Sequence, residues 1–183
     1  MSDIRRFHVV RRSRLNAMTA HTTYTTTDSP VGKLLLVGDG HALTSLSLPG
    51  QRTAPFVRSD WRRDDEAFGE ARRQLTAYFE GRFPRFDLDL APAGTEFQQR
   101  VWRALDEIPY GTTTTYGELA ARLDVPRAEI RAVGAAIGAN PLLIVRPCHR
   151  VIGADGSMRG YAGGVEQKVR LLTHEGALQQ TLA

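Results

Sequence analysis

The hydrophobic pattern of the chain changes its period once, at residues 91–94, and this change limits the folds open to it. Before this point, short apolar runs between turn residues predict strands at residues 22–27, 33–37, 42–48 and 86–90. One helical stretch opens at Asp64 and Asp65 and ends at Gly81. Apolar residues then recur at helical spacing. The pattern predicts an α+β fold: a small N-terminal domain with an antiparallel sheet and one or two helices, then a mainly α-helical C-terminal domain.

The second half of the chain has the outline of a helix-turn-helix. Thr95 to Gln98 fit a capping box at the start of a helix with an apolar face. A short helix over residues 116–123 and a longer one over residues 127–139 follow, and Pro126 lies in the break between them. This outline predicts a helix-turn-helix, although helix pairs in protein cores share it.

Positive charge is concentrated at the N-terminus. Residues 1–21 carry five arginines and one aspartate, which accounts for the formal net charge of +4 of the whole chain. This segment has no hydrophobic periodicity, so we expect a disordered basic tail. We place a sheet domain over residues 22–92 and a helix-turn-helix and active-site domain over residues 93–183. Net charge therefore says little about what the folded part binds.

A stretch inside the second domain is more informative than net charge. Residues 130–154 contain no acidic residue but include Arg131, Arg146 and Arg150, which indicates either a solvated face or a surface for DNA. Residues 132–139 are nearly all small, and two glycines inside a helix cost about 1 kcal/mol each relative to alanine. Close approach of another backbone would offset this cost. That partner is either another helix of the protein or a nucleic-acid groove.

Cys148 is the only cysteine, which excludes an intramolecular disulfide and a cysteine-rich zinc site. The five histidines form no clustered ligand set, so we expect no metal and no cofactor. A free thiol suits a reducing compartment. The sequence has neither an apolar run long enough for a bilayer nor a secretory signal, so we expect a cytoplasmic protein.

The neighbours of Cys148 distinguish it from the ordinary buried cysteine, which behaves as a small hydrophobe. An apolar run over residues 142–145, predicted to be a buried strand or extended segment, precedes it, followed by Pro147. His149 and Arg150 come next, and nearby cations favour the nucleophilic thiolate. Adjacent side chains of an extended chain point to opposite faces, so coupling of His149 to Cys148 needs a turn or a bridging water.

The segment Pro147-Cys148-His149-Arg150-Val151 resembles the active-site signature of the O6-alkylguanine-DNA alkyltransferases. The resemblance also covers Asn140-Pro141, Gly160 to Gly164, Leu171 to Gly176, and, upstream, much of Phe97 to Arg131 with Tyr110-Gly111, Thr115 to Ala120 and Arg131 to Gly134. The N-terminal half shares the layout of the family, with weaker residue identity.

The resemblance implies direct, stoichiometric DNA repair. Such proteins bind the minor groove, flip O6-alkylguanine or O4-alkylthymine out of the duplex and transfer the alkyl group to a cysteine. By resemblance, Cys148 is this acceptor and acts once. His149 is the base that acts through a bridging water, Glu175 orients His149, and Asn140 organises the backbone of the cysteine turn.

The resemblance also assigns residues to the substrate and to DNA. The substrate-binding set is Tyr116 at the purine ring nitrogen, Tyr161, Ala162 and Gly163 in the loop over the flipped base, and Lys168 in support of that loop. The DNA-binding set is the intercalating Arg131, then Ala132 and Gly134 in the minor groove, and Gln98 at the backbone. Two residues depart from the family pattern: Ala162 where other members have serine, and the charged Arg146 where an aliphatic residue is usual.

The implied partner is double-stranded DNA that contains O6-alkylguanine. We expect a monomer in solution with no obligate protein partner and no membrane association, and cooperative binding on DNA stays open. A damage-recognition protein without transfer activity is one alternative, but such relatives lack the cysteine. A helix-turn-helix regulator with a thiol sensor would need polar residues for major-groove readout, which residues 132–139 lack. A metal-dependent hydrolase would need a ligand cluster.

Overall fold

The computed structural model describes residues 21–82 and 85–178. The sheet domain contains a four-stranded sheet in the order β3-β2-β1-β4. Its strands are β1 (Thr23–Thr27), β2 (Leu34–Gly38), β3 (Leu43–Ser47) and β4 (Arg62–Arg63). The first three form the predicted antiparallel meander, whereas β4, which was not predicted, pairs in parallel with β1. Apart from His21, the predicted basic tail lies outside the described residues.

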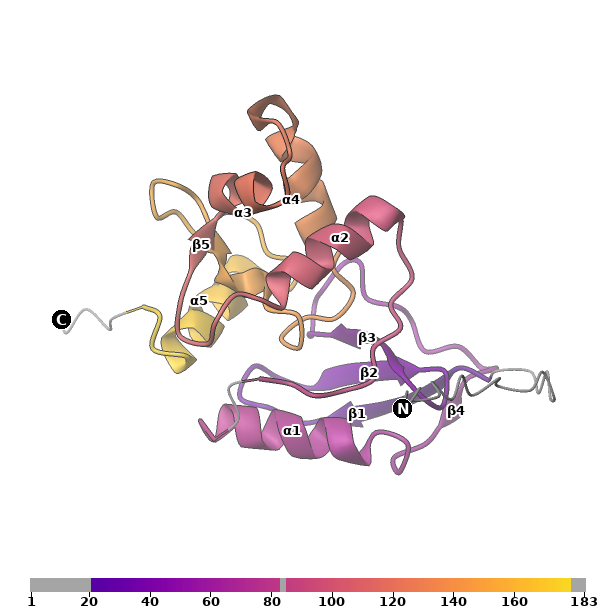
Figure 1. Cartoon of the computed structure of the whole chain (residues 1–183). Helices are drawn as coiled ribbons and strands as arrows, with labels where there is room; N and C mark the ends of the chain where they lie inside the picture. Colours follow the sequence, from indigo (N-terminus) through magenta and orange to yellow (C-terminus); the bar gives the residue numbers. More distant parts are fainter. Residues whose placement is uncertain (1–20, 83–84, 179–183) are drawn as a thin grey trace, which may run out of the picture.

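Helix α1 (Gly69–Phe79) covers one face of the sheet, and the helical domain lies over the other face (Figure 1). The buried residues of α1 include Ala71, Leu75 and Tyr78, which share one face of the helix, as the apolar spacing predicts. Gly81 follows the helix end with a φ of 70°, a conformation that glycine adopts at little cost.

The predicted start of α1 at Asp64 and Asp65 is wrong, because both carboxylates bond elsewhere. Asp64 Oδ1 accepts the N–H of Ala67 at 3.1 Å, which closes a turn. Asp65 Oδ1 accepts the hydroxyl of Thr25 at 2.6 Å, which ties this turn to β1. The helix therefore begins about one turn later than the acidic pair indicates.

The strand predicted over residues 86–90 is also wrong. The segment is extended, but its only ladder contact among the described residues is an isolated bridge between Leu43 and Leu90. The side chain of Gln74 instead bonds both backbone groups of Asp87, donating to its carbonyl at 2.8 Å and accepting its N–H at 2.9 Å. A side chain of α1 thus replaces the neighbouring strand that the alternating pattern predicts.

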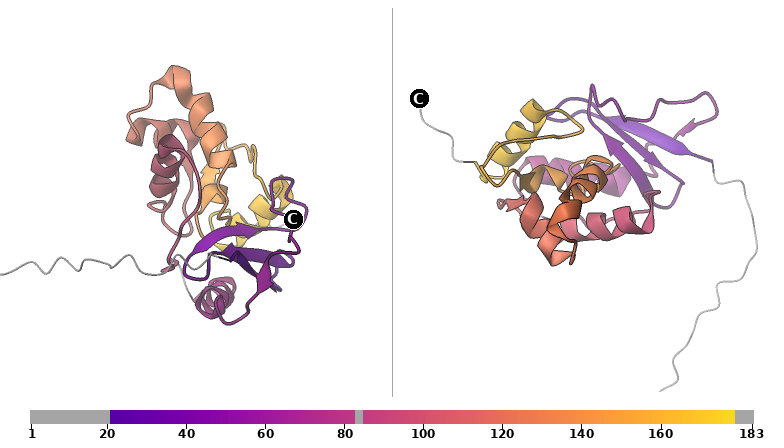
Figure 2. Two further views of the ribbon diagram at one scale, coloured as in Figure 1. Left: turned by 90° about the vertical axis from the view of Figure 1, so that its right-hand side faces the viewer. Right: turned by 90° about the horizontal axis from the view of Figure 1, so that it is seen from above.

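The helical domain contains α2 (Glu96–Leu105), α3 (Tyr116–Arg122), α4 (Ile130–Gly138) and α5 (Val165–His174). A short parallel pair, β5 (Thr114–Thr115) with β6 (Val151–Ile152), links its two halves. Both views in Figure 2 show these helices gathered on one side of the sheet. The α+β fold is therefore confirmed.

Local capping signals place two of these helices. The predicted box at the start of α2 is present: Thr95 Oγ1 accepts the N–H of Gln98, and Gln98 Oε1 accepts the N–H of Thr95. Thr115 and Glu118 form a second box at α3. The first turn of the helix predicted over residues 127–139 is a 3₁₀ turn, and α4 proper begins at Ile130.

The apolar run over residues 142–145 is buried as predicted, but it is not a strand. Leu46 of β3 donates to the Pro141 carbonyl at 2.8 Å and accepts the N–H of Leu143 at 3.1 Å, which forms a single bridge. The chain then turns back through Ile144, whose φ is 71°. This reversal brings Cys148 under α4 and joins the cores of the two domains in one cluster.

No helix in the described parts of the chain has both the length and the apolar composition needed to cross a membrane.

Candidate active site

Cys148 begins a 3₁₀ turn that covers residues 148–150, and it is only 4% exposed. Asn140, at the end of α4, organises this turn. Its Nδ2 donates to Cys148 Sγ at 3.2 Å and to the Arg146 carbonyl at 3.0 Å, while its Oδ1 accepts the N–H of Leu142 at 3.0 Å. One buried amide therefore fixes both the thiol and the backbone that leads to it.

The environment of Cys148 favours the thiol over the thiolate. Burial raises the pKa of Cys148 to about 11, although the Asn140 hydrogen bond and the positive charge of Lys168 act in the opposite direction. Because the thiolate is the nucleophile, a reaction at this sulfur requires a base that removes the proton.

His149 is fully buried and lies beside a carboxylate. Its Nε2 is 2.7 Å from Glu175 Oε1. Burial lowers the pKa of His149 against the opposing effect of Glu175, so the ring is neutral near pH 7. An ionised carboxylate only accepts, so the proton of the neutral ring is on Nε2. Nδ1 is then a lone-pair acceptor, and it has no hydrogen-bond partner among the described residues.

Glu175 accepts hydrogen bonds from several groups at once. Arg150 donates from Nε to Oε2 at 2.8 Å and from Nη2 to Oε1 at 3.0 Å, and the Tyr78 hydroxyl donates to Oε1 at 2.6 Å. Burial alone would raise the pKa of Glu175, but the bonds from His149 and Arg150 lower it to about 2. The carboxylate is therefore ionised at neutral pH.

Two of these partners were missed by sequence reasoning. Arg150 was considered only as a cation near the thiol and as part of a basic stretch, not as a partner of Glu175. Tyr78 was counted only as an apolar residue of α1. The available signal was weak: a tyrosine on a buried helix face needs a hydrogen-bond partner for its hydroxyl, but the sequence does not say which.

Cys148 faces a cavity of about 540 Å³. The predicted substrate residues Tyr116, Tyr161, Ala162 and Gly163 all line it, as does Gly134 of α4. The cavity is large enough for a purine-sized ligand.

Lys168 does not line the cavity, but it binds backbone carbonyls at the start of the loop over residues 160–164, which does. The buried ammonium donates to the carbonyls of Val151 at 2.6 Å, Arg159 at 3.1 Å and Gly160 at 3.3 Å. Burial lowers its pKa to about 8. The Tyr116 hydroxyl donates to the same Arg159 carbonyl at 3.0 Å, so both side chains fix the start of the loop.

The sheet domain supplies a further wall of the cavity, which the sequence did not indicate. Gly50, Arg52 and Thr53 line it from the turn after β3. The buried side chain of Gln51 shapes this turn, since it accepts the N–H of Leu48 at 3.2 Å and donates to Thr53 Oγ1 at 3.1 Å. A short polar turn looks like any surface turn in sequence, so no local signal could have identified it.

The glycines of α4 are not required by packing within the protein. A Cβ on Gly134 would be 3.9 Å from the Tyr116 ring, an ordinary contact, and a Cβ on Gly138 would meet nothing within 4 Å. Helices α2 and α3 pack against α4, but this packing does not require glycine at either position. Arg131 and Ala132 are exposed on the first turn of the same helix.

Two other predicted positions have roles inside the protein. The side-chain oxygen of Gln98 caps α2, and its predicted contact with the DNA backbone stays a prediction. The buried Arg146 finds a carboxylate, as its charge requires: its Nε is 3.4 Å from Asp106 Oδ2. Its Nη1 is buried without a partner among the described residues.

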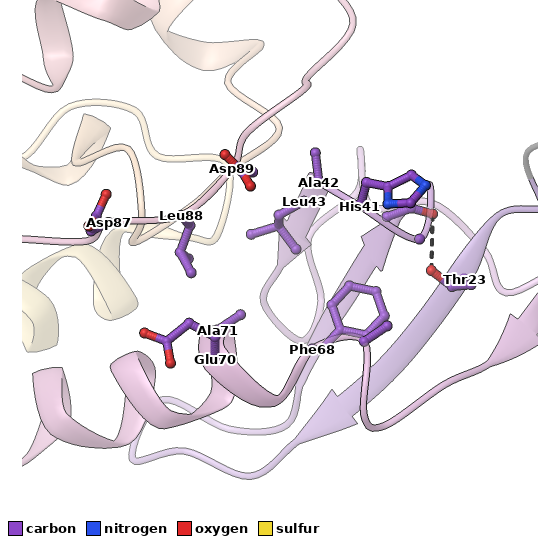
Figure 3. A pocket seen from close by; sticks show the side chains of 13 residues that line it. Thr23, His41, Ala42, Leu43, Phe68, Glu70, Ala71, Asp87, Leu88 and Asp89 are labelled. Carbon is purple, nitrogen blue, oxygen red and sulfur yellow. Dashed lines mark hydrogen bonds between the residues drawn. The ribbon is translucent and has the colours of Figure 1, made fainter. Parts of the chain in front are cut away.

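A second, smaller cavity of about 180 Å³ lies between the sheet and α1 (Figure 3). Its acidic residues Glu70, Asp87 and Asp89 do not converge on one point in this view. No group of side chains that could hold a metal ion is found anywhere in the described residues. This cavity therefore has none of the chemistry that surrounds Cys148.

Comparisons with known proteins identify relatives over both domains. The family model of the ribonuclease-like domain of 6-O-methylguanine DNA methyltransferase matches residues 22–92, and the model of its DNA-binding domain matches residues 96–177. The methylated-DNA–protein-cysteine methyltransferase of Methanosarcina acetivorans is 49% identical over 154 residues, which cover 84% of this chain and 98% of the relative.

A mycobacterial relative of the same name, from Mycobacterium tuberculosis, is 51% identical over 83% of this chain and 91% of its own length. The crystal structure of Mycobacterium tuberculosis OGT in complex with DNA matches with a TM-score of 0.78 and 48% identity, covering 85% of this chain and 93% of that one. The matches cover both domains at high identity. The chain belongs to the 6-O-methylguanine DNA methyltransferase family.

Proposed function

We propose that this protein repairs alkylated DNA by transferring the alkyl group from O6 of guanine to Cys148. The observation that carries the proposal is that Cys148 lines a purine-sized cavity and is bonded by Asn140, while the adjacent His149 is paired with Glu175. The names of the relatives, methylated-DNA–protein-cysteine methyltransferases, support the same reaction.

Proton removal is the first chemical step. His149 Nδ1 takes the thiol proton of Cys148 through a bridging water, because no direct hydrogen bond joins the two among the described residues. Glu175 holds the ring in the tautomer that leaves Nδ1 free and stabilises the imidazolium that results. Asn140 Nδ2, which already donates to Sγ, stabilises the thiolate.

Alkyl transfer follows as a displacement at carbon. The thiolate electron pair forms the S–C bond, the C–O6 bond breaks, and its electron pair stays on the guanine, which takes up a proton. Tyr116 lies on the cavity wall and donates to the Arg159 carbonyl in this structure, so its hydroxyl must exchange that partner to serve the purine nitrogen. The product thioether does not hydrolyse under ordinary conditions, so each molecule acts once.

The cavity can accept only a nucleotide that has left the duplex, and we assign that extrusion to α4. The exposed Arg131 fills the gap in the base stack, and the small residues around Ala132 and Gly134 allow the helix to approach the minor groove closely. Such contacts carry little base information, so O4-alkylthymine is also a substrate. The protein acts as a monomer in a reducing compartment such as the cytoplasm, where the single thiol stays reduced.

The direct test is an alkyl-transfer experiment with intact-mass detection. The protein is mixed with a duplex oligonucleotide that contains one O6-methylguanine. We expect one added methyl group, located on the peptide that contains Cys148, and no addition to a Cys148→Ser control that still binds the duplex. Binding of the duplex without any gain in mass would contradict the proposal and favour a damage-recognition protein.

The role of Arg131 is tested by comparing two substrates. We expect Arg131→Ala to react normally with free O6-benzylguanine, which needs no extrusion, but to react about tenfold or more slowly with duplex DNA, because extrusion costs a few kcal/mol. Arg127→Ala, an exposed arginine on the preceding 3₁₀ turn, is the matched control for loss of charge. Equal losses on both substrates would refute an extrusion role.

A further inference from the structure

The sheet domain reaches the proposed catalytic carboxylate through one side chain. Tyr78 lies near the end of α1, and its hydroxyl donates to Glu175 Oε1 at 2.6 Å across 97 residues of sequence. Tyr78 is 0% exposed. Burial and the nearby charge of Glu175 raise the pKa of Tyr78, so the hydroxyl keeps its proton and always donates.

This hydrogen bond is not needed to satisfy the carboxylate. Oε1 already accepts from His149 and from Arg150, and Oε2 accepts from Arg150 and, at 3.4 Å, from the Gly111 N–H. Tyr78 adds a further donor to the same oxygen that orients His149. Each donor on a carboxylate oxygen withdraws electron density, which weakens its attraction for the remaining protons.

We infer that Tyr78 is a positioning residue for the proposed reaction, which limits how strongly Glu175 increases the basicity of His149. The inference rests on the proposed function, because His149 must be neutral to accept the proton of Cys148. A carboxylate with fewer donors would bind the His149 proton more tightly and hold more of the ring in the charged form at neutral pH. The sheet domain thereby contributes to the chemistry without contributing the nucleophile or the base.

Other charged and titratable groups also face this pair, and they stay in place when the Tyr78 hydroxyl is removed. They are Arg150 and Cys148 on the 3₁₀ turn, Tyr110 after α2, Lys168 on α5, and Tyr161 in the cavity loop. Within the described part of the chain, Arg150 is the one group among these that donates a hydrogen bond to Glu175. A change on removal of one hydroxyl can therefore be assigned to that hydroxyl.

The variant Tyr78→Phe should fold. Its ring packs against Phe79, Phe86, Tyr110 and His174, and these contacts do not involve the hydroxyl. Glu175 Oε1 keeps two donors, so no buried acceptor is left without a partner. Loss of the hydroxyl thus removes one electrostatic contact and little else.

The test measures the titration of His149 directly, by imidazole NMR of the unalkylated protein, with the His149→Gln spectrum for assignment. In Tyr78→Phe we expect the pKa of His149 to rise by about one unit, the size of a hydrogen bond to a charged group. The rate of reaction with free O6-benzylguanine should show the same upward shift of its acidic limb, since a higher pH is then needed to obtain the neutral ring.

Tyr110→Phe is the matched control. Its ring centroid is 6.0 Å from that of Tyr78 and close to the same carboxylate, but its hydroxyl makes no hydrogen bond to Glu175 among the described contacts. We expect its His149 titration to match that of the wild type. An unshifted titration in Tyr78→Phe, with only a lower melting temperature or a uniformly lower rate, would overturn the inference. A shifted titration in a protein whose wild type takes the alkyl group from neither O6-benzylguanine nor the O6-methylguanine duplex would support the coupling and refute the proposed function.

Discussion

The two domains bury different kinds of polar side chain. In the sheet domain, the buried polar residues of the described chain are all neutral: Thr23, Thr25, Ser47, Gln51 and Gln74. In the helical domain they include five ionisable residues: Arg146, His149, Arg150, Lys168 and Glu175. The carboxylates and cations of the sheet domain form ion pairs at its surface instead, such as Arg73 with Glu70.

This difference shows where the protein accepts an energetic cost. Removal of an ion from water costs several kcal/mol even after relaxation, and only good hydrogen bonds offset the cost. The sheet domain avoids the cost, because its buried hydroxyls and amides are neutral and bond to partners within the same domain. The helical domain concentrates the cost around Cys148, where the pKa values of His149, Lys168 and Glu175 are shifted. Substitution of a buried charged residue should therefore change the free energy of unfolding more than substitution of an exposed one.

The largest effect is expected for Glu175→Gln. Arg150 would lose its ionised partner while 5% exposed, so the free energy of unfolding should fall by about 3 kcal/mol. The tautomer of His149 would no longer be fixed, so the rate of alkyl transfer should fall about 100-fold or more. Urea denaturation and single-turnover kinetics with O6-benzylguanine measure the two effects. A variant as stable and as fast as the wild type would remove the basis of the comparison.

Glu175→Gln should also change how the stability of the protein depends on pH. The pKa of Glu175 is lowered from 4.5 to about 2 in the folded protein, so its ionised form stabilises the fold above pH 4.5. This contribution is lost as the pH falls from 4.5 towards 2. Wild-type stability should therefore decline more steeply in this interval than that of Glu175→Gln.

A smaller effect, of opposite sign, is expected for Arg146→Leu. The side chain is 8% exposed, and its Nη1 has no partner among the described residues, so an aliphatic residue should fit its site better. Asp106 is 36% exposed and stays hydrated without it. We expect the free energy of unfolding to rise by about 1 kcal/mol, by urea denaturation, with the reaction with O6-benzylguanine unchanged. A loss of stability would show that the pair with Asp106 outweighs its desolvation.

The smallest effect is expected for Glu70→Gln, the control from the sheet domain. Hydrogen bonds from Arg73 and Gln74 lower the pKa of Glu70 to about 2, the same value as that of Glu175. Its side chain is 54% exposed, however, and solvent screens the pair. We expect no measurable change in the urea midpoint or in its pH dependence. A change as large as that of Glu175→Gln would show that burial is not what separates the two domains.

Features with local causes could be predicted from the sequence. The capping box of Thr95 and Gln98 and the turns of the meander involve residues a few positions apart, and the structure has them where the pattern indicates. The wrongly predicted strand over residues 86–90 has a cause that lies far away in the sequence. Its hydrogen bonds go to Gln74, and no periodicity reports that a distant side chain replaces a strand.

The residues of the candidate site also fall into those that the sequence could predict and those that it could not. The resemblance brings together Cys148, His149, Glu175 and Asn140, and in the structure Asn140 is bonded to Cys148 and His149 to Glu175. Tyr78 and the turn at Arg52 come from the other domain, and they reach the site only because the helical domain packs on the sheet. Contacts of this kind depend on how two cores join, which a single sequence does not reveal.

Ile144 shows what joins these cores. A left-handed backbone costs roughly 1–2 kcal/mol for a residue with a side chain, whereas burial of an isoleucine contributes about 1.5–3 kcal/mol. Its φ of 71° is therefore held by a side chain that is 0% exposed. The adjacent Leu143 is bonded to Leu46 of β3. A fragment that begins at residue 93 would lack this strand, so the bend before Cys148 would relax and the reactive sulfur would lose its placement. The sheet domain thus holds the backbone that leads to Cys148, and the two domains share one core.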